Sequence, residues 1–202
     1  MPQDWEPESW DESQASNVAR QVNKLRGQRS AQWLSDETHQ HGYRVSRATI
    51  ADLENGRRRY VTVAEVAVLA AALNTAPVAL LYPGPNYNEH IEVLPRIADR
   101  KIEAVQWFSG IRDHGFTDSP DGAQSARLRN EYQDHIRELR LWRELLDVYR
   151  KISSVRVPAR RVNGEMVVGE LSDAQLAQLD AYNDQVHFLR SQLGLEGLDD
   201  GG

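Results

Sequence analysis

Apolar residues in the segment 18–82 recur every three or four positions, in five short runs separated by polar residues or glycine. This spacing predicts amphipathic helices, because it places the apolar side chains on one face of each helix. The expected helices cover residues 18–25, 31–40, 47–55, 63–73 and 76–82. Ser30, Ser46 and Thr62 stand at the N-cap positions of the second, third and fourth helices. Gly56 stands where a left-handed C-cap ends the third.

The pattern changes after residue 82. Residues 83–86 contain two prolines and a glycine, which predicts a linker. Residues 91–94 predict a short extended segment, and 101–111 predict a buried helix or turn. The longest helical pattern covers residues 123–152, where apolar side chains four and three apart are typical of a coiled-coil seam. The expected seam consists of Leu128, Tyr132, His135, Leu139, Trp142, Leu146 and Tyr149. Ile136, Leu145 and Ile152 widen this face, so we expect the helix to pack on more than one partner.

The end of the chain predicts a β-hairpin and a last helix. Asn163-Gly164 suits a tight turn, so a hairpin is expected near 155–168. Ser172 and Asp173 open a final helical pattern that continues to Leu193. The seam has two interpretations that can both hold: packing within one chain against residues 172–193, or pairing between two chains.

These elements predict a mainly α protein in four parts. Residues 1–17 form an acidic, flexible arm, whose two tryptophans leave open that one of them docks on a domain. Residues 18–83 form a domain of five helices, and 84–122 form a linker and connecting segment. Residues 123–202 form a helical module with a long helix, a small β-hairpin and a final helix, and we expect this module to pair two chains.

Composition excludes several classes of function. The chain has 202 residues, of which 40% are hydrophobic and 27% charged, as in ordinary globular proteins. It has no cysteine, and therefore no disulfide or thiolate metal site, and His39 and His41 alone do not make a metal site. No apolar run approaches the ~20 residues that span a bilayer, and the N-terminus lacks a signal-peptide pattern. We expect a cytoplasmic protein, associated with the nucleoid when it is bound to DNA.

No enzymatic chemistry is expected. No nucleophile, base and orienting acid are suggested by their spacing, and no glycine-rich phosphate loop occurs. We therefore predict neither a catalytic residue nor a cofactor.

Charge is distributed unevenly along the chain. The formal net charge is -6, yet residues 18–60 contain nine basic residues against four acidic ones. Residues 1–17, in contrast, contain five acidic residues and no basic one. An acidic protein can still bind DNA through one basic face, so this block indicates a nucleic-acid partner.

The third expected helix and its flanks are the most informative stretch. Its first turn bears short polar side chains and an arginine, which can reach base edges in the major groove. Arg57, Arg58 and Arg59 follow its C-terminal glycine and can contact phosphates.

Residues 18–82 resemble the Cro/C1-type (XRE) family of helix-turn-helix regulators. The resemblance depends on Ser30 and Leu34, on Val45-Ser46, and on the run Ile50-Ala51-Asp52-Leu53-Glu54-Asn55-Gly56-Arg57. It covers about a third of the chain and implies a five-helix DNA-binding domain. Residues 92–95 and 104–110 are similar to segments of such regulators from actinobacteria, without implying a ligand. One departure is clear: Leu34 and Ser46 lie about five residues further apart than the family's compact turn, so the second helix is longer or the turn bulges.

The resemblance also implies roles for individual residues. The base-reading positions are Arg47, Ala48, Thr49 and Asp52. The positions that contact or approach the DNA backbone are Ser30, Gln32, Ser46, Asn55, Arg57 and Arg58, to which the arginine run adds Arg59. Arg47 suits a bidentate contact to guanine, and Asp52 either accepts a hydrogen bond from a cytosine amine or holds Arg47.

These observations favour a sequence-specific transcriptional regulator, a repressor, that binds double-stranded DNA as a homodimer with the helix at 47–55 in the major groove. The alternative is a protein-interaction adaptor or antitoxin-like protein built on the same fold. A third hypothesis is an unidentified small-molecule or protein effector that binds around Trp107, with Phe108 and Trp142, although such aromatic residues are more often core.

Overall fold

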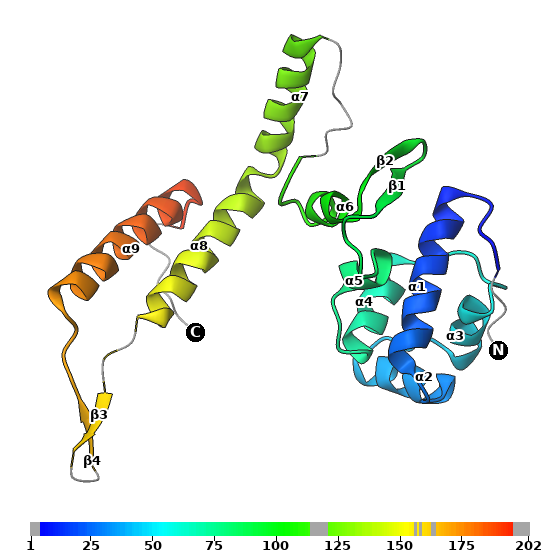
Figure 1. Ribbon diagram of the computed structural model, residues 1–202, viewed down its shortest axis with the longest axis horizontal. Coiled ribbons are helices and arrows are strands. Elements are labelled where there is room, and N and C mark those ends of the chain that lie inside the picture. Colours follow the sequence, from blue (N-terminus) through cyan, green and yellow to red (C-terminus); the bar gives the residue numbers. More distant parts are fainter. Residues whose placement is uncertain (1–4, 114–120, 156, 158, 163–164, 196–202) are drawn as a thin grey trace. The chain divides into compact units, whose positions relative to one another are not determined.

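The computed structural model describes residues 5–113, 121–155, 157, 159–162 and 165–195 (Figure 1). The chain divides into two compact units, residues 1–116 and residues 117–202. The described part is mainly helical, with two small antiparallel sheets of two strands each. No helix in it is long and apolar enough to cross a membrane.

The first unit contains six of the described helices and one β-hairpin. Their bounds are α1 Trp10–Arg26, α2 Ala31–Gln40, α3 Arg47–Glu54, α4 Val63–Ala72, α5 Pro77–Leu81, β1 His90–Leu94, β2 Ile97–Arg100 and α6 Lys101–Phe108. The predicted bounds of α2 to α5 are confirmed to within one residue. The predicted N-caps are confirmed as well, because Ser30, Ser46 and Thr62 each accept a hydrogen bond from a backbone N–H of the first turn.

Helices α1 to α5 surround one apolar core (Figure 1). Its fully buried side chains come from every one of these helices and include Val18, Val22, Leu34, Ile50, Leu69 and Leu80. Burying each such side chain contributes about 1.5–3 kcal/mol, so this core fixes the orientation of the short helix α3, whose eight residues would not be stable alone.

Helix α1 is longer than the sequence pattern predicted. It begins at Trp10, so residues 10–17, which we expected in a flexible arm, are helical. Ser9 caps the helix through its side chain, and Asp11 and Glu12 place negative charge in the first turn, where the helix dipole favours it. Ala15 is buried and extends the apolar face of the helix. The expectation of a flexible arm is therefore wrong for residues 10–17.

The segment expected as a linker and connector is largely folded. Strands β1 and β2 pair in antiparallel fashion, and α6 follows directly. Tyr82, Val93 and Ala104 are the buried centre of a second apolar cluster. Lys101 holds the start of α6 to the loop that precedes β1, because its ammonium group donates hydrogen bonds to the carbonyl of Pro83 (2.9 Å) and to the carboxylate of Glu89 (2.7 Å). The expected extended segment at 91–94 is confirmed as part of β1.

The second unit consists of α7 Gly122–His135, α8 Arg137–Ser154, β3 Ala159–Val162, β4 Glu165–Val168 and α9 Asp173–Gln192. The single long helix expected at 123–152 is interrupted at Ile136, which is the C-cap of α7 and the N-cap of α8. The predicted hairpin is confirmed by the pairing of β3 with β4, but its turn at Asn163-Gly164 lies outside the described residues.

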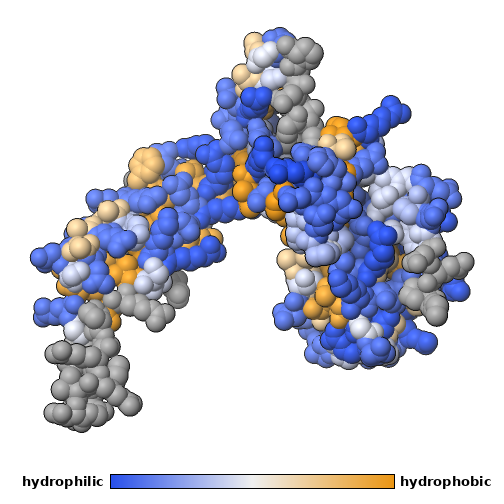
Figure 2. All heavy atoms as spheres, in the orientation of Figure 1, coloured by the Kyte–Doolittle hydropathy of each residue, from blue (hydrophilic) through white to orange (hydrophobic). Residues whose placement is uncertain are grey.

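Helices α8 and α9 pack side by side in this unit (Figure 1). Leu145, Val148 and Leu189 are the buried centre of their contact. Most of the expected seam is not in this contact: Leu139, Trp142 and Leu146 are 46%, 40% and 48% exposed. The face that packs within the chain is therefore rotated from the predicted seam, and Figure 2 shows hydrophobic surface along this helical hairpin.

Candidate nucleic-acid interface

Helix α3 presents its first turn to solvent. Ile50 and Leu53 are buried on its inner face, and the hydroxyl of Ser46 accepts a hydrogen bond from the backbone N–H of Thr49 (3.0 Å). Arg47 and Ala48 are consequently exposed. Thr49 and Asp52 are partly exposed, and the Thr49 hydroxyl lies 2.8 Å from that of Ser46. The structure thus brings the expected base-reading residues onto one accessible side of a short, well-anchored helix.

A long turn precedes α3 and explains the unusual spacing between Leu34 and Ser46. Helix α2 ends at Gln40, and the chain needs residues 41–46 to reach α3. The buried hydroxyl of Thr38 accepts a hydrogen bond from the backbone N–H of Val45 (3.0 Å), and Val45 is itself buried. The extra residues therefore form a bulged turn. The hydrogen bond between Val45 and Thr38 fixes the end of this turn, directly before Ser46, the N-cap of α3.

A second anchor fixes the C-terminal end of α3. Arg26 of α1 makes a bidentate contact to Glu54, with Nε–Oε1 and Nη2–Oε2 distances of 2.9 and 2.7 Å. Both side chains are largely buried, at 14% and 8% exposure. The hydrogen bonds that Arg26 donates to the Glu54 carboxylate raise the pKa of Arg26 above its ordinary value. Arg26 is one of the nine basic residues in the segment 18–60, but its pairing with Glu54 gives it a structural role and makes it unavailable to DNA.

The three consecutive arginines after α3 have three different surroundings. Arg57 is 78% exposed in its side chain and lies 3.5 Å from Asp52, which therefore faces Arg57. The guanidinium of Arg58 pairs with Glu65 of α4 (2.6 Å) at 17% exposure and lies over the ring of Tyr60. Arg57 is thus the accessible charge, whereas Arg58 is engaged in the packing of the loop against α4.

The Arg58–Glu65 pair also explains how the loop before α4 is held. Burial acts to raise the pKa of the Glu65 carboxyl, but hydrogen bonds from Arg58 and from Thr62 outweigh it, and the pKa lies below its ordinary value. The same carboxylate accepts from the backbone N–H of Thr62 (2.9 Å) and completes a capping box. One carboxylate therefore ties the arginine run to the N-terminus of α4.

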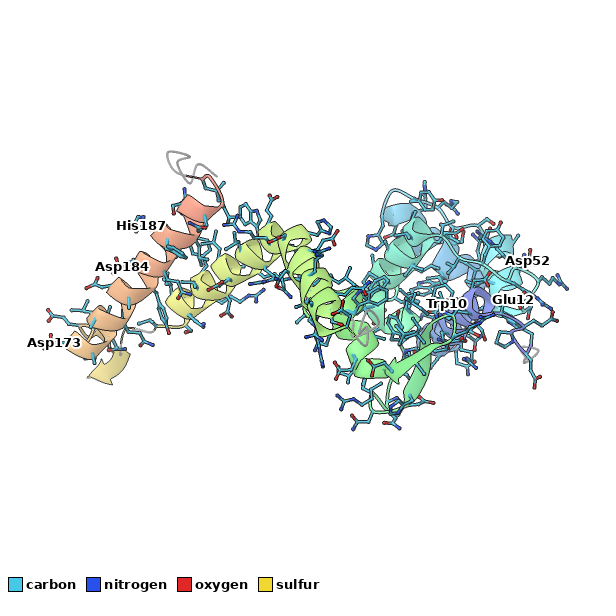
Figure 3. The ribbon with its side chains drawn as sticks, turned by 90° about the horizontal axis from the view of Figure 1, so that it is seen from above. Trp10, Glu12, Asp52, Asp173, Asp184 and His187 are labelled. Carbon is cyan, nitrogen blue, oxygen red and sulfur yellow. The ribbon has the colours of Figure 1, made fainter. Side chains whose placement is uncertain are left out.

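Arg59 is covered in part by the acidic N-terminal segment. Its Nη1 atom lies 3.2 Å from Glu12 and 3.6 Å from Glu8, and the guanidinium lies 5.4 Å from the centre of the Trp5 ring. Hydrogen bonding to Glu12 raises the pKa of Arg59 above its ordinary value. Glu12 of α1 and Asp52 of α3, both labelled in Figure 3, are the partners of Arg59 and Arg57. We call residues 5–12 the acidic clasp.

Trp5 of the clasp also covers Gly56. Gly56 has a φ of +69°, which glycine adopts without strain, and a Cβ at this position would clash with the Trp5 ring. The sequence left open that one of the two tryptophans docks on a domain, and in the structure both do. Trp5 covers Gly56, and the indole N–H of Trp10 donates a hydrogen bond to the carbonyl of Val93 (3.2 Å).

Sequence reasoning did not identify the clasp as part of the site. The signal was present, because Ser9 is followed three residues later by Glu12, which is a typical helix-start pattern.

The remaining expected backbone contacts lie at the starts and ends of helices. Ser30 is the exposed N-cap of α2 and accepts from the backbone N–H of Trp33 (3.0 Å). Gln32 is exposed and donates to Asp36 (3.0 Å), and Asn55 is the exposed C-cap of α3. Within the described residues, no group of three or more histidine and acidic side chains gathers as metal ligands would.

Comparison with known proteins gives no assignment, because no protein family, no curated protein and no solved structure matches this chain.

Proposed function

We propose that this protein is a sequence-specific DNA-binding transcriptional regulator, a repressor, that inserts α3 into the major groove. The observation that supports this most is the arrangement of α3: a buried inner face, anchors at both ends, an exposed first turn with Arg47, and the exposed Arg57 after its C-terminal end. An arginine so placed can make a bidentate contact to guanine, while Arg57 can neutralise a phosphate. The helix-turn-helix assignment of α2 and α3 belongs to this proposal. No catalytic role is part of it.

The proposed regulator acts as a homodimer. The α8–α9 hairpin leaves Leu139, Trp142 and Leu146 exposed along one stripe of α8, spaced three and four residues apart. A hairpin of two helices has too small a core to leave such a stripe in water without cost, and a second copy would bury it. Pairing of two chains would also allow two recognition helices to reach half-sites about 34 Å apart.

Fluorescence anisotropy with duplex DNA tests the DNA-binding proposal. The first duplex is taken from the region upstream of the protein's own gene, and the second has the same composition in scrambled order. Arg47→Ala should reduce the preference for the first duplex about tenfold, since one bidentate base contact contributes about 1–3 kcal/mol of discrimination. Arg57→Ala should weaken binding to both duplexes equally and reduce the salt slope by about 1.

Arg20→Ala is the matched control. Arg20 is exposed and bonded to Asn17, whose amide in turn donates to the carbonyl of Leu81, so it lies on the side of α1 that meets α5. The Arg20→Ala variant should bind both duplexes as the wild type does. The proposal is wrong if the wild type prefers neither duplex and if Arg57→Ala leaves the salt slope unchanged.

A protein-interaction adaptor is the second candidate, and the acidic clasp favours it. Acidic side chains that neutralise Arg59 reduce the attraction of this surface for phosphate. An adaptor would retain a stoichiometric protein partner in a pull-down and no DNA.

A further inference from the structure

An apolar cavity of about 520 Å³ lies in the first unit, away from the tip of α3. Its walls come from α1, α4, α5, β1, α6 and the loop before α4. Trp10, Val66, Leu81, Tyr82, Val93 and Trp107 are among the lining residues. Tyr60, Val63 and Phe108 also line it and are 63%, 87% and 54% exposed, so they form its mouth. The volume is typical of a small-molecule site, and large for a packing defect.

The walls of the cavity are held in place by interactions that need no ligand. The Trp10 indole is fixed by its hydrogen bond to the Val93 carbonyl, and the Tyr82 and Phe108 rings meet edge to face at 5.9 Å. Val93 and Tyr82 are buried in the cluster that joins α5, β1 and α6. The cavity is therefore preformed, and a ligand would not have to order it.

Tyr82 contributes a polar group to the wall of the cavity. Tyr82 is only 4% exposed, and its hydroxyl makes no hydrogen bond to any described residue. Burial raises the pKa of this phenol, so it stays neutral and can donate. The hydroxyl is not among the fully buried side-chain atoms that lack a partner in the described chain, so it keeps some accessible surface, and an acceptor on a ligand could pair with it.

We propose that this cavity binds an uncharged, largely apolar small molecule with one hydrogen-bond acceptor directed at Tyr82. The apolar walls disfavour a charged ligand, and Asp11, the charged residue among those lining the cavity, repels anions from the mouth. Two aromatic side chains from different helices, Trp10 of α1 and Trp107 of α6, line the cavity and suit a flat aromatic or alicyclic body. This site does not depend on the proposed DNA binding.

Prodan, an uncharged naphthalene ketone whose emission reports both polarity and hydrogen bonding, is a suitable probe. We expect saturable, blue-shifted emission with one prodan bound per chain of the full-length protein. Ala67→Trp should weaken binding at least about tenfold, because Ala67 is an exposed position on α4 that lines the cavity, and a tryptophan there would fill it. Ala64→Trp is the matched control, since Ala64 is exposed on the same helix but does not line the cavity, and it should bind as the wild type does.

Tyr82→Phe supplies a second test that preserves the packing. It should weaken prodan about fivefold and remove the hydrogen-bonding component of the emission, while leaving thermal stability unchanged or higher. Equal binding by Ala67→Trp and Ala64→Trp would overturn the proposal, because prodan would then occupy another apolar surface such as the exposed stripe of α8. So would an absence of saturable binding, or a change of oligomeric state in Ala67→Trp by light scattering, which would make this face a contact between copies.

Discussion

Neutralising the acidic clasp should strengthen DNA binding by a defined amount. The double substitution Glu8→Gln and Glu12→Gln removes the two carboxylates 3.6 and 3.2 Å from Arg59. Glutamine also serves at the third position of a helix, so the start of α1 is preserved. Arg59, once released, can neutralise one more phosphate. The slope of log K against log salt should then steepen by about 0.9.

This slope sets the size of the effect. Between about 50 and 200 mM salt, one further phosphate contact makes the variant lose about 3.5-fold more affinity than the wild type loses. At the lower salt concentration we expect a gain in affinity of about two- to fivefold, since exposed ion pairs are weak competitors. The assay is fluorescence anisotropy with one labelled duplex, repeated at four salt concentrations.

The control must separate this contact from net charge. Glu6→Gln with Asp11→Asn removes the same number of charges from the same segment, and neither side chain pairs with Arg59. This control should leave the slope unchanged. Adding Arg59→Ala to the Glu8→Gln, Glu12→Gln variant should abolish the gain. If the test and control variants show the same slope, Arg59 does not reach phosphate and the reasoning is refuted.

Three further predictions concern stability and coupling. Glu54→Ala should lower the free energy of unfolding by about 3 kcal/mol in urea denaturation, because it leaves Arg26 buried without its partner; a loss near zero would show that the pair does not anchor α3. Glu65→Gln should make the protein lose less stability on acidification than the wild type does. The pKa of Glu65 is depressed in the folded protein, so its contribution to stability is complete above its ordinary pKa of 4.5 and is lost as the pH falls through the lower folded pKa. Thermal melts of both proteins at stepped pH would measure this difference. Saturating prodan should change DNA affinity several-fold through Tyr60, which lines the cavity and lies 4.2 Å from Arg58; this effect depends on the proposed function, whereas prodan binding alone does not.

Local features of the sequence predicted α2 to α5 well, because these helices are set by short-range signals. Ser46 caps α3 and Gly56 follows it with a positive φ, as their residue types indicate. Two other features were not predictable in this way. The interruption at Ile136 divides a continuous helical pattern, and no proline or glycine marks it. The pairing of Arg26 with Glu54 joins residues 28 positions apart, which no helical periodicity reveals.

The arginine run shows why a charge count along the sequence is insufficient for the candidate site. Arg57, Arg58 and Arg59 are chemically identical and adjacent, yet their neighbours differ: a partly exposed Asp52, a largely buried Glu65, and the clasp. Only the second of these partners is buried enough to hold its arginine against competition from phosphate in water. For the proposed regulator, Arg57 is then available at all times, Arg58 fixes the loop, and Arg59 is available only when Glu8 and Glu12 leave it. The affinity for DNA would therefore depend on a segment that does not itself contact DNA.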